Sequence, residues 1–133
     1  MFKRALTYAA NGVPAPMRAG DGLLGNIAIT SVATDSAQVI TVAQMAGGMI
    51  QYTGFTAGRG ITTPTAALIL AANPGMDVGD SFSFIVSVVP AFAGTWAAGT
   101  GVTLSGRATT PASSWSIVTV TKTSATAVTW NVS

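Results

Sequence analysis

The side chains that could do acid–base or metal chemistry in this chain are few. All four acidic residues are aspartates, namely Asp21, Asp35, Asp77 and Asp80, and histidine and cysteine are absent from the 133 residues. Without these two residue types the chain lacks the usual neutral-pH proton shuttle, a thiolate nucleophile and nitrogen or sulfur metal ligands. We therefore expect no catalytic residues, no metal site and no cofactor.

One pair of carboxylates has a spacing that hydrolysis could use. Asp77 and Asp80 stand three residues apart in GMDVGD, and glycoside hydrolysis requires two acidic groups. Aspartate is also favoured in turns, because its carboxylate accepts hydrogen bonds from nearby backbone N–H groups. The flanking glycines favour that second interpretation, so we predict a turn at 76–80.

The elements that would position any site are mainly strands. In SFSFIVSVV (81–89) apolar residues alternate, which places Phe82, Phe84, Val86 and Val88 on one face. The same pattern between glycine and proline turns predicts further strands. They lie at 26–32, 36–41, 49–55, 95–98, 102–104, 107–109, 115–121 and 125–132. We expect a hairpin between the first two of these and another between the last two.

One segment has the sequence features of a helix. Thr63 can cap it, Pro64 can take its first position, TAALILAA follows, and Asn73-Pro74-Gly75 ends it. This predicts a helix over 64–72, whereas 42–48 reads as a turn or a single helical turn. The fold class predicted is all-β, an antiparallel β-sandwich or jelly roll with one short helix and an extended N-terminal arm.

The predicted domain organisation is an arm over residues 1–20 and one sandwich domain over 21–133. Pro14 and Pro16 disfavour a helix in the arm, which has a charge of +3, while the remainder sums to −1. The arm is either a solvated terminus or a segment that docks on an acidic partner surface. Nucleic-acid binding is disfavoured because the body is slightly acidic. The candidate docking residues are Phe2, Lys3, Arg4, Tyr8 and Arg18.

The composition is apolar and poor in charge, with 49% hydrophobic and 8% charged residues. No apolar run reaches the length of about 18 residues that a bilayer requires, so we expect neither membrane insertion nor secretion. Such a surface favours an oligomer or a particle subunit. Trp96, Trp115 and Trp130 are expected in the core or on strand faces, or else as anchors of a subunit interface or contacts to sugar.

Three segments within residues 41–121 carry a resemblance to a known class of proteins. They are MAGGMIQYTG, TTPTAALILAANPGMDVGDSFSFIVSVV and GTWAAGTGVTLSGRATTPASSW. The pattern resembles structural proteins of tailed bacteriophages, and most closely the small head decoration, or cement, proteins. That resemblance implies a β-sandwich or jelly roll that binds the outside of an icosahedral shell.

The resemblance also implies partners and a location. The expected partners are the major capsid protein and further copies of this chain, as a homodimer or homotrimer, on the exterior of a virion assembled in the host cytoplasm. The arm lies outside the resemblance, and the docking role of its residues is a physical hypothesis. The alternative is a fibre or receptor-binding module that contacts a host glycan or protein through loops 56–60 and 90–95, with Trp96. A glycan-processing enzyme is the least favoured interpretation.

Overall fold

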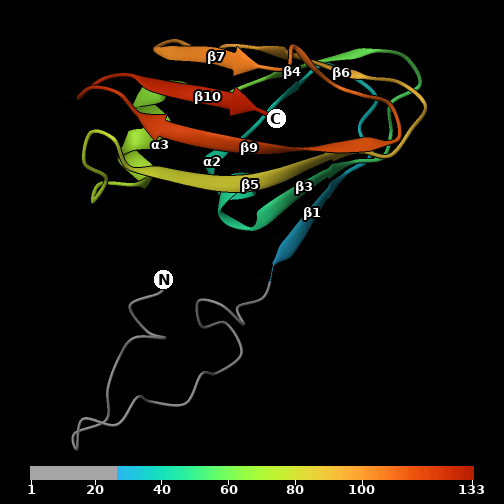
Figure 1. Cartoon of the computed structure of the whole chain (residues 1–133). Coiled ribbons are helices and arrows are strands. Elements are labelled where there is room, and N and C mark those ends of the chain that lie inside the picture. Colours follow the sequence, from blue (N-terminus) through green and yellow to red (C-terminus); the bar gives the residue numbers. More distant parts are fainter. Residues whose placement is uncertain (1–26) are drawn as a thin grey trace, which may run out of the picture.

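The computed structural model of this protein describes residues 27–133, which form two packed β-sheets with two short helices at one end (Figure 1). Strands account for 46% and helices for 11% of these residues. The mostly-β class is therefore confirmed. The predicted arm, with its five candidate docking residues, lies outside the described residues. Among the residues described, no helix is long and apolar enough to cross a membrane.

The larger sheet has six strands and faces the viewer in Figure 1. Its pairs β5–β9 and β9–β10 are antiparallel, which confirms the predicted C-terminal hairpin, while β1–β3, β3–β5 and β10–β7 are parallel. The strands, in spatial order, are β1 (Ala28–Val32), β3 (Gly48–Tyr52), β5 (Ser81–Val88), β9 (Ser114–Lys122), β10 (Val128–Val132) and β7 (Val102–Gly106).

The smaller sheet has four strands behind the larger one. They are, in spatial order, β2 (Gln38–Val39), β4 (Arg59–Thr62), β6 (Gly94–Ala97) and β8 (Thr109–Thr110). The pairs β2–β4 and β4–β6 are parallel, and β6–β8 is antiparallel. Both sheets are therefore mixed, and the prediction of a purely antiparallel jelly roll is wrong.

The predicted hairpin between 26–32 and 36–41 is also wrong, because β1 and β2 belong to different sheets. Asp35 lies in the connection between them. Its carboxylate accepts hydrogen bonds from the Thr56 backbone N–H (3.0 Å) and from Arg59 Nε (2.9 Å). These bonds join the connection to the loop that leads into β4, and the chain crosses to the second sheet instead of turning back.

Two helices close one end of the sandwich. The first, α2 (Val42–Ala46), starts at a capping box formed by Thr41 and Gln44. The second, α3 (Ala66–Ala72), has Thr65 as its N-cap, with the hydroxyl accepting from Leu68 N–H at 3.3 Å. The predicted cap, Thr63, is instead buried and accepts a hydrogen bond from Gly99 N–H at 2.9 Å. The helix consequently begins later than predicted.

The core lies between the sheets, and the even-numbered residues of β5 and β9 contribute to it together with residues of most other elements. Phe84, Val86 and Val88 are buried as the alternation predicted. Trp130 is fully buried, with its ring 5.3 Å from that of Phe84 and 5.7 Å from that of Trp96. Large aromatic rings therefore fill the space between the two layers.

A short chain of buried hydrogen bonds links Trp96 to two hydroxyl groups, whereas the indole nitrogen of Trp130 has no hydrogen-bond partner among the described residues. The Trp96 Nε1–H donates to Thr110 Oγ1 at 3.2 Å, and that hydroxyl donates to Ser116 Oγ at 3.0 Å. All three residues are buried, and β8 thereby bonds to both sheets through its side chains. Because buried polar groups are costly unless paired, this chain stabilises the contact between the two sheets.

Candidate docking surface

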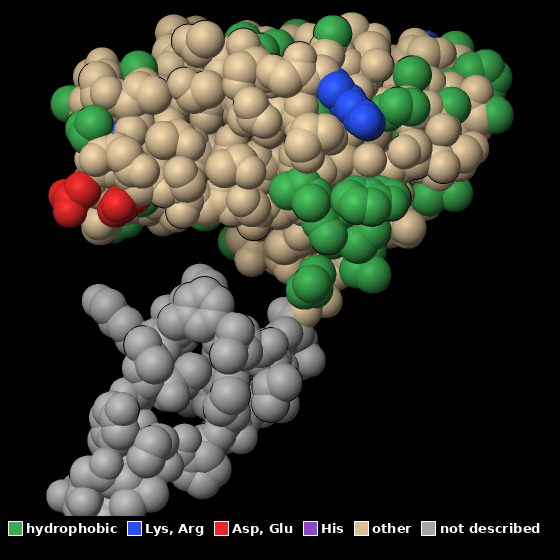
Figure 2. All heavy atoms as spheres, viewed as in Figure 1, with side chains coloured by type: hydrophobic (Ala, Val, Ile, Leu, Met, Phe, Trp, Pro, Cys, Tyr) green, Lys and Arg blue, Asp and Glu red, His purple; other side chains and the backbone are tan. Residues whose placement is uncertain are grey.

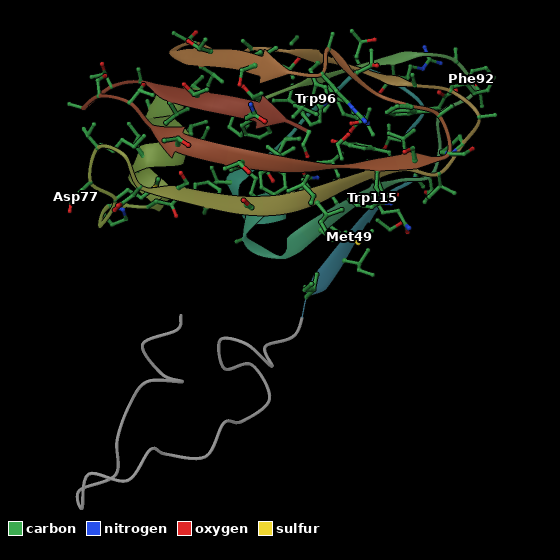
Figure 3. The ribbon with its side chains drawn as sticks, viewed as in Figure 1. Met49, Asp77, Phe92, Trp96 and Trp115 are labelled. Carbon is green, nitrogen blue, oxygen red and sulfur yellow. The ribbon has the colours of Figure 1, made fainter. Side chains whose placement is uncertain are left out.

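An apolar row crosses the outer face of the six-stranded sheet. The sheet register places Ile29 opposite Met49, Met49 opposite Ile85, and Ile85 opposite Ile117. The row therefore crosses β1, β3, β5 and β9 in a straight line. Three strand spacings separate its ends, or about 14 Å. We call these four residues the apolar row; Figure 3 shows Met49 in front of the sheet, toward the viewer.

Trp115 lies beside the apolar row, two residues before Ile117 on the same strand face. It is 58% exposed, so of the expected places, the core or a strand face, it takes a strand face that is open to solvent. The reason is the alternation of side chains along β9, in which the even-numbered residues Ser116, Val118 and Val120 point inward. Because side chains alternate along a strand, Trp115 must then point outward, as Figure 3 shows.

The apolar surface extends beyond the apolar row to residues next to β1 and in the connection after β5. Ile27 and Ile29 are 61% and 59% exposed, and Val89 and Phe92 in the connection after β5 are also exposed. In Figure 2, hydrophobic atoms gather over this end of the visible face. No charged side chain occupies an outward position of β1, β3, β5 or β9. Surface of this kind on a soluble protein usually contacts a partner.

The other end of the same face is polar. The hydroxyl of Ser81 bonds that of Thr121 at 2.8 Å, and the hydroxyl of Ser83 bonds that of Thr119 at 3.0 Å. These pairs lie on the same two strands that carry Ile85 and Ile117. The outer face is therefore divided along β5 and β9 into a hydroxyl-bearing half and an apolar half.

A recess of about 210 Å³ adjoins Trp115. Its lining is formed by the ends of β5 and β9 and the connections beside them, and comprises Ser87, Val88, Val89, Ser113, Ser114 and Trp115. Ser113 has a φ of +50°, a conformation that costs energy for a residue with a side chain. Its hydroxyl donates to Val89 O at 3.3 Å, and its N–H donates to Pro90 O at 2.9 Å. These bonds hold the recess in shape.

A second, larger hollow of about 450 Å³ lies between the β2–β4 edge and α3. Val39 and Leu68 are its exposed apolar side chains, at 63% and 57%. The Thr63 hydroxyl and the Gly99 N–H in its lining already bond to each other. Apart from backbone groups, this hollow offers mainly apolar contacts.

On the face seen in Figure 2, the acidic side chains lie at the far end from the hydrophobic atoms, whereas one lysine or arginine side chain lies close above them. Asp77 and Asp80 form the predicted turn: the Asp80 carboxylate accepts from Asp77 N–H at 2.9 Å, and Asp80 N–H donates to Asp77 O at 3.0 Å. Asp77 is labelled in Figure 3 at the end of the molecule opposite Phe92.

The Arg59 side chain and the Thr56 hydrogen bonds hold the pKa of Asp35 well below its usual range. Within 27–133, no three potential metal-ligating residues cluster.

The predicted site residues have different outcomes. Trp96 and Trp130 are buried within the chain, so neither is available to a partner or a sugar, and of the three tryptophans only Trp115 offers a contact surface. Phe2, Lys3, Arg4, Tyr8 and Arg18 lie outside the described residues. Comparisons of this chain with protein-family models, curated proteins and solved structures find no match.

Sequence reasoning missed the apolar row altogether. Its members come from four strands far apart in the chain, and only the sheet register brings them into line. A signal for the exposure of Trp115 did exist. Thr119 and Thr121 are odd-numbered residues of β9 and therefore lie on the same strand face as Trp115. Two threonines on one strand face indicate that this face is the solvent side.

Proposed function

We propose that this chain is a structural virion protein that binds the outer surface of an icosahedral phage head and stabilises the capsid by bridging major capsid protein subunits. The observation that carries the proposal is the apolar row, with Trp115, on strands whose outward positions hold no charged side chain. It supports a role in protein contact, and the resemblance of residues 41–121 supplies the kind of particle. No catalytic role is proposed.

The stabilising effect follows from mass action. A protein that binds the assembled shell, but not its dissociated subunits, favours the assembled state by an amount set by its concentration relative to its Kd. In this proposal the apolar half of the outer face contacts the shell, and the hydroxyl-bearing half stays in water. Phe2, Lys3, Arg4 and Arg18 contribute a second contact. Self-association would make the attachment multivalent and so strengthen it further.

The test is a saturation binding assay on expanded, undecorated heads of the parent phage with the purified full-length chain. We expect saturation at a fixed ratio near one copy per major capsid subunit, with improved resistance of the heads to heat. Binding of the chain to decorated heads, whose sites are filled, is the matched control. Absence of binding, or a handful of copies per head, would refute the cement function.

A second function is favoured by the recess beside Trp115. An exposed aromatic ring opposite Ser87, whose hydroxyl is on the same strand face, offers stacking and a hydrogen bond to a sugar. In this alternative the chain is a fibre or receptor-binding module that contacts a host surface glycan or protein. A low copy number per virion, together with binding to purified host polysaccharide that Trp115→Ser abolishes, would favour the module over the cement protein.

A further inference from the structure

The strand β1 leaves one of its edges without a partner among residues 27–133. It is the terminal strand of the six-stranded sheet and pairs only with β3. The Ala28 N–H donates to Gly47 O at 2.8 Å, and the Val32 carbonyl accepts from Thr53 N–H at 2.9 Å. Because alternate residues of a strand bond to the same neighbour, the N–H and C=O groups of Ile29 and Ser31 point away from β3.

Exposed edges of this kind are usually protected by a proline, a lysine or another charge. The segment from Ile27 to Ala33, IAITSVA, contains none of these. Ile29 also begins the apolar row, so a strand added here would both complete the backbone hydrogen bonds and shield apolar surface. The chemistry of this edge therefore fits an uncharged β-strand.

We propose that the strand that occupies this edge is β1 of a second copy of the chain, paired antiparallel about a two-fold axis at Thr30. In that arrangement Ile29 of each copy lies opposite Ser31 of the other. The pair exchanges both N–H···O=C bonds, so two such pairs give four hydrogen bonds. The two six-stranded sheets become one continuous sheet across the dimer.

The charges of the described chain are compatible with this self-association. Its three cationic side chains, Arg59, Arg107 and Lys122, balance Asp35, Asp77 and Asp80, so the part of the chain in residues 27–133 has no net charge. No charged residue lies within β1 or β3. Two copies consequently approach along β1 without like charges meeting, which would otherwise cost several kcal/mol.

This dimer does not depend on the proposed attachment to a phage head. Trp115 lies three strands from the β1 edge, about 14 Å away, and remains exposed in the dimer. Trp115→Ser should therefore leave the dimer intact, whereas a face-to-face dimer would be weakened. The two proposals can thus fail separately.

The first experiment is sedimentation velocity of the full-length chain over a wide range of concentration, combined with backbone amide hydrogen exchange by NMR. We expect a monomer–dimer equilibrium. The Ile29 and Ser31 amides should exchange at least tenfold more slowly at high than at low concentration, while the Thr30 amide, which faces β3, is protected throughout. A monomer at every concentration would overturn the proposal, as would protection of Ile29 and Ser31 that is independent of concentration, which would indicate that the edge is covered by the chain itself.

The second experiment uses substitution at the edge. Ser31→Pro removes an outward N–H that β3 does not use, and should abolish dimerisation while the thermal unfolding transition remains cooperative. Ser31→Ala keeps the N–H and is the matched control, with dimerisation unchanged. A dimer that persists in folded Ser31→Pro contradicts the pairing. If Ser31→Pro fails to fold, the concentration dependence of the wild-type amides decides the question.

Discussion

Replacing Trp115 by serine is the most direct test of the apolar surface. The exposed 58% of this residue is the part available to a partner. For an aromatic side chain that buries about 200 Å², that fraction is about 115 Å² of apolar surface. At about 25 cal/mol per Å², its burial against a shell subunit contributes about 3 kcal/mol. Trp115→Ser should therefore raise the Kd for undecorated heads about a hundred-fold.

The loss should be one of binding and not of folding. The buried remainder of Trp115 contributes about 2 kcal/mol to the folded chain, which is less than the stability of an ordinary domain. Circular dichroism should therefore show a folded variant with a lowered Tm. Two controls accompany it. Trp115→Phe keeps most of the apolar surface and should weaken binding less than about tenfold. Thr129→Ala, on the outer face of β10, should leave the Kd unchanged.

A folded Trp115→Ser that binds heads with a Kd within about threefold of the wild type would refute the reasoning, since such a change is under 1 kcal/mol. The same conclusion would follow if Thr129→Ala weakened binding as much as Trp115→Ser. In that case the apolar half of the sheet would not be the surface that meets the shell.

Three further predictions concern the folded chain itself. Trp130→Ala should lower the free energy of unfolding, measured with denaturant, by about 3–5 kcal/mol, because a fully buried ring is lost; a smaller loss would mean that the sheets collapse onto the gap. The pKa of Asp35 is depressed chiefly by Arg59, so Asp35 stabilises the fold above its ordinary pKa near 3.8 and loses this effect as the pH falls below it. The difference in Tm between wild type and Asp35→Asn should thus shrink from pH 5 to pH 2, and a constant difference would contradict this. Gly106→Ala should unfold the chain or lower its stability by more than about 2 kcal/mol, since φ is +80° and the added Cβ would collide with the Val132 carbonyl; a wild-type Tm would contradict it.

The positions of most strands could be predicted from the sequence because alternation is a local signal, but β4 (Arg59–Thr62) was missed, since residues 56–60 were predicted as a loop. Phe82, Phe84, Val86 and Val88 share a face in SFSFIVSVV, and that face is the core side of β5. The turn at Asp77 and Asp80 was likewise predictable, since its bonds join residues three apart. Interactions between residues a few positions apart in the chain can be recognised from the sequence alone.

The pairing of strands could not be predicted in the same way. Strands β1 and β2 are separated by a short connection that has the composition of a hairpin turn. In the connection between them, Asp35 bonds to Thr56 and Arg59, which are more than twenty residues away. A contact between residues so far apart in the chain gives no repeating pattern in the sequence from which it could be predicted. The parallel pairing of β1 with β3, and with it the register of the apolar row, depends on the same crossover.

In the proposed function, the two halves of the outer face have different parts in binding. On β5 and β9 the serine–threonine pairs satisfy each other, so the hydroxyl half loses little when it stays in water and would gain little from a protein contact. The apolar half, from Ile29 to Trp115, gains free energy only when it is covered. Because both halves belong to the same rigid sheet, a partner that covers the apolar half leaves the hydroxyl half outside. In the proposed function, the outward residues of two strands therefore set the orientation of the protein on its partner.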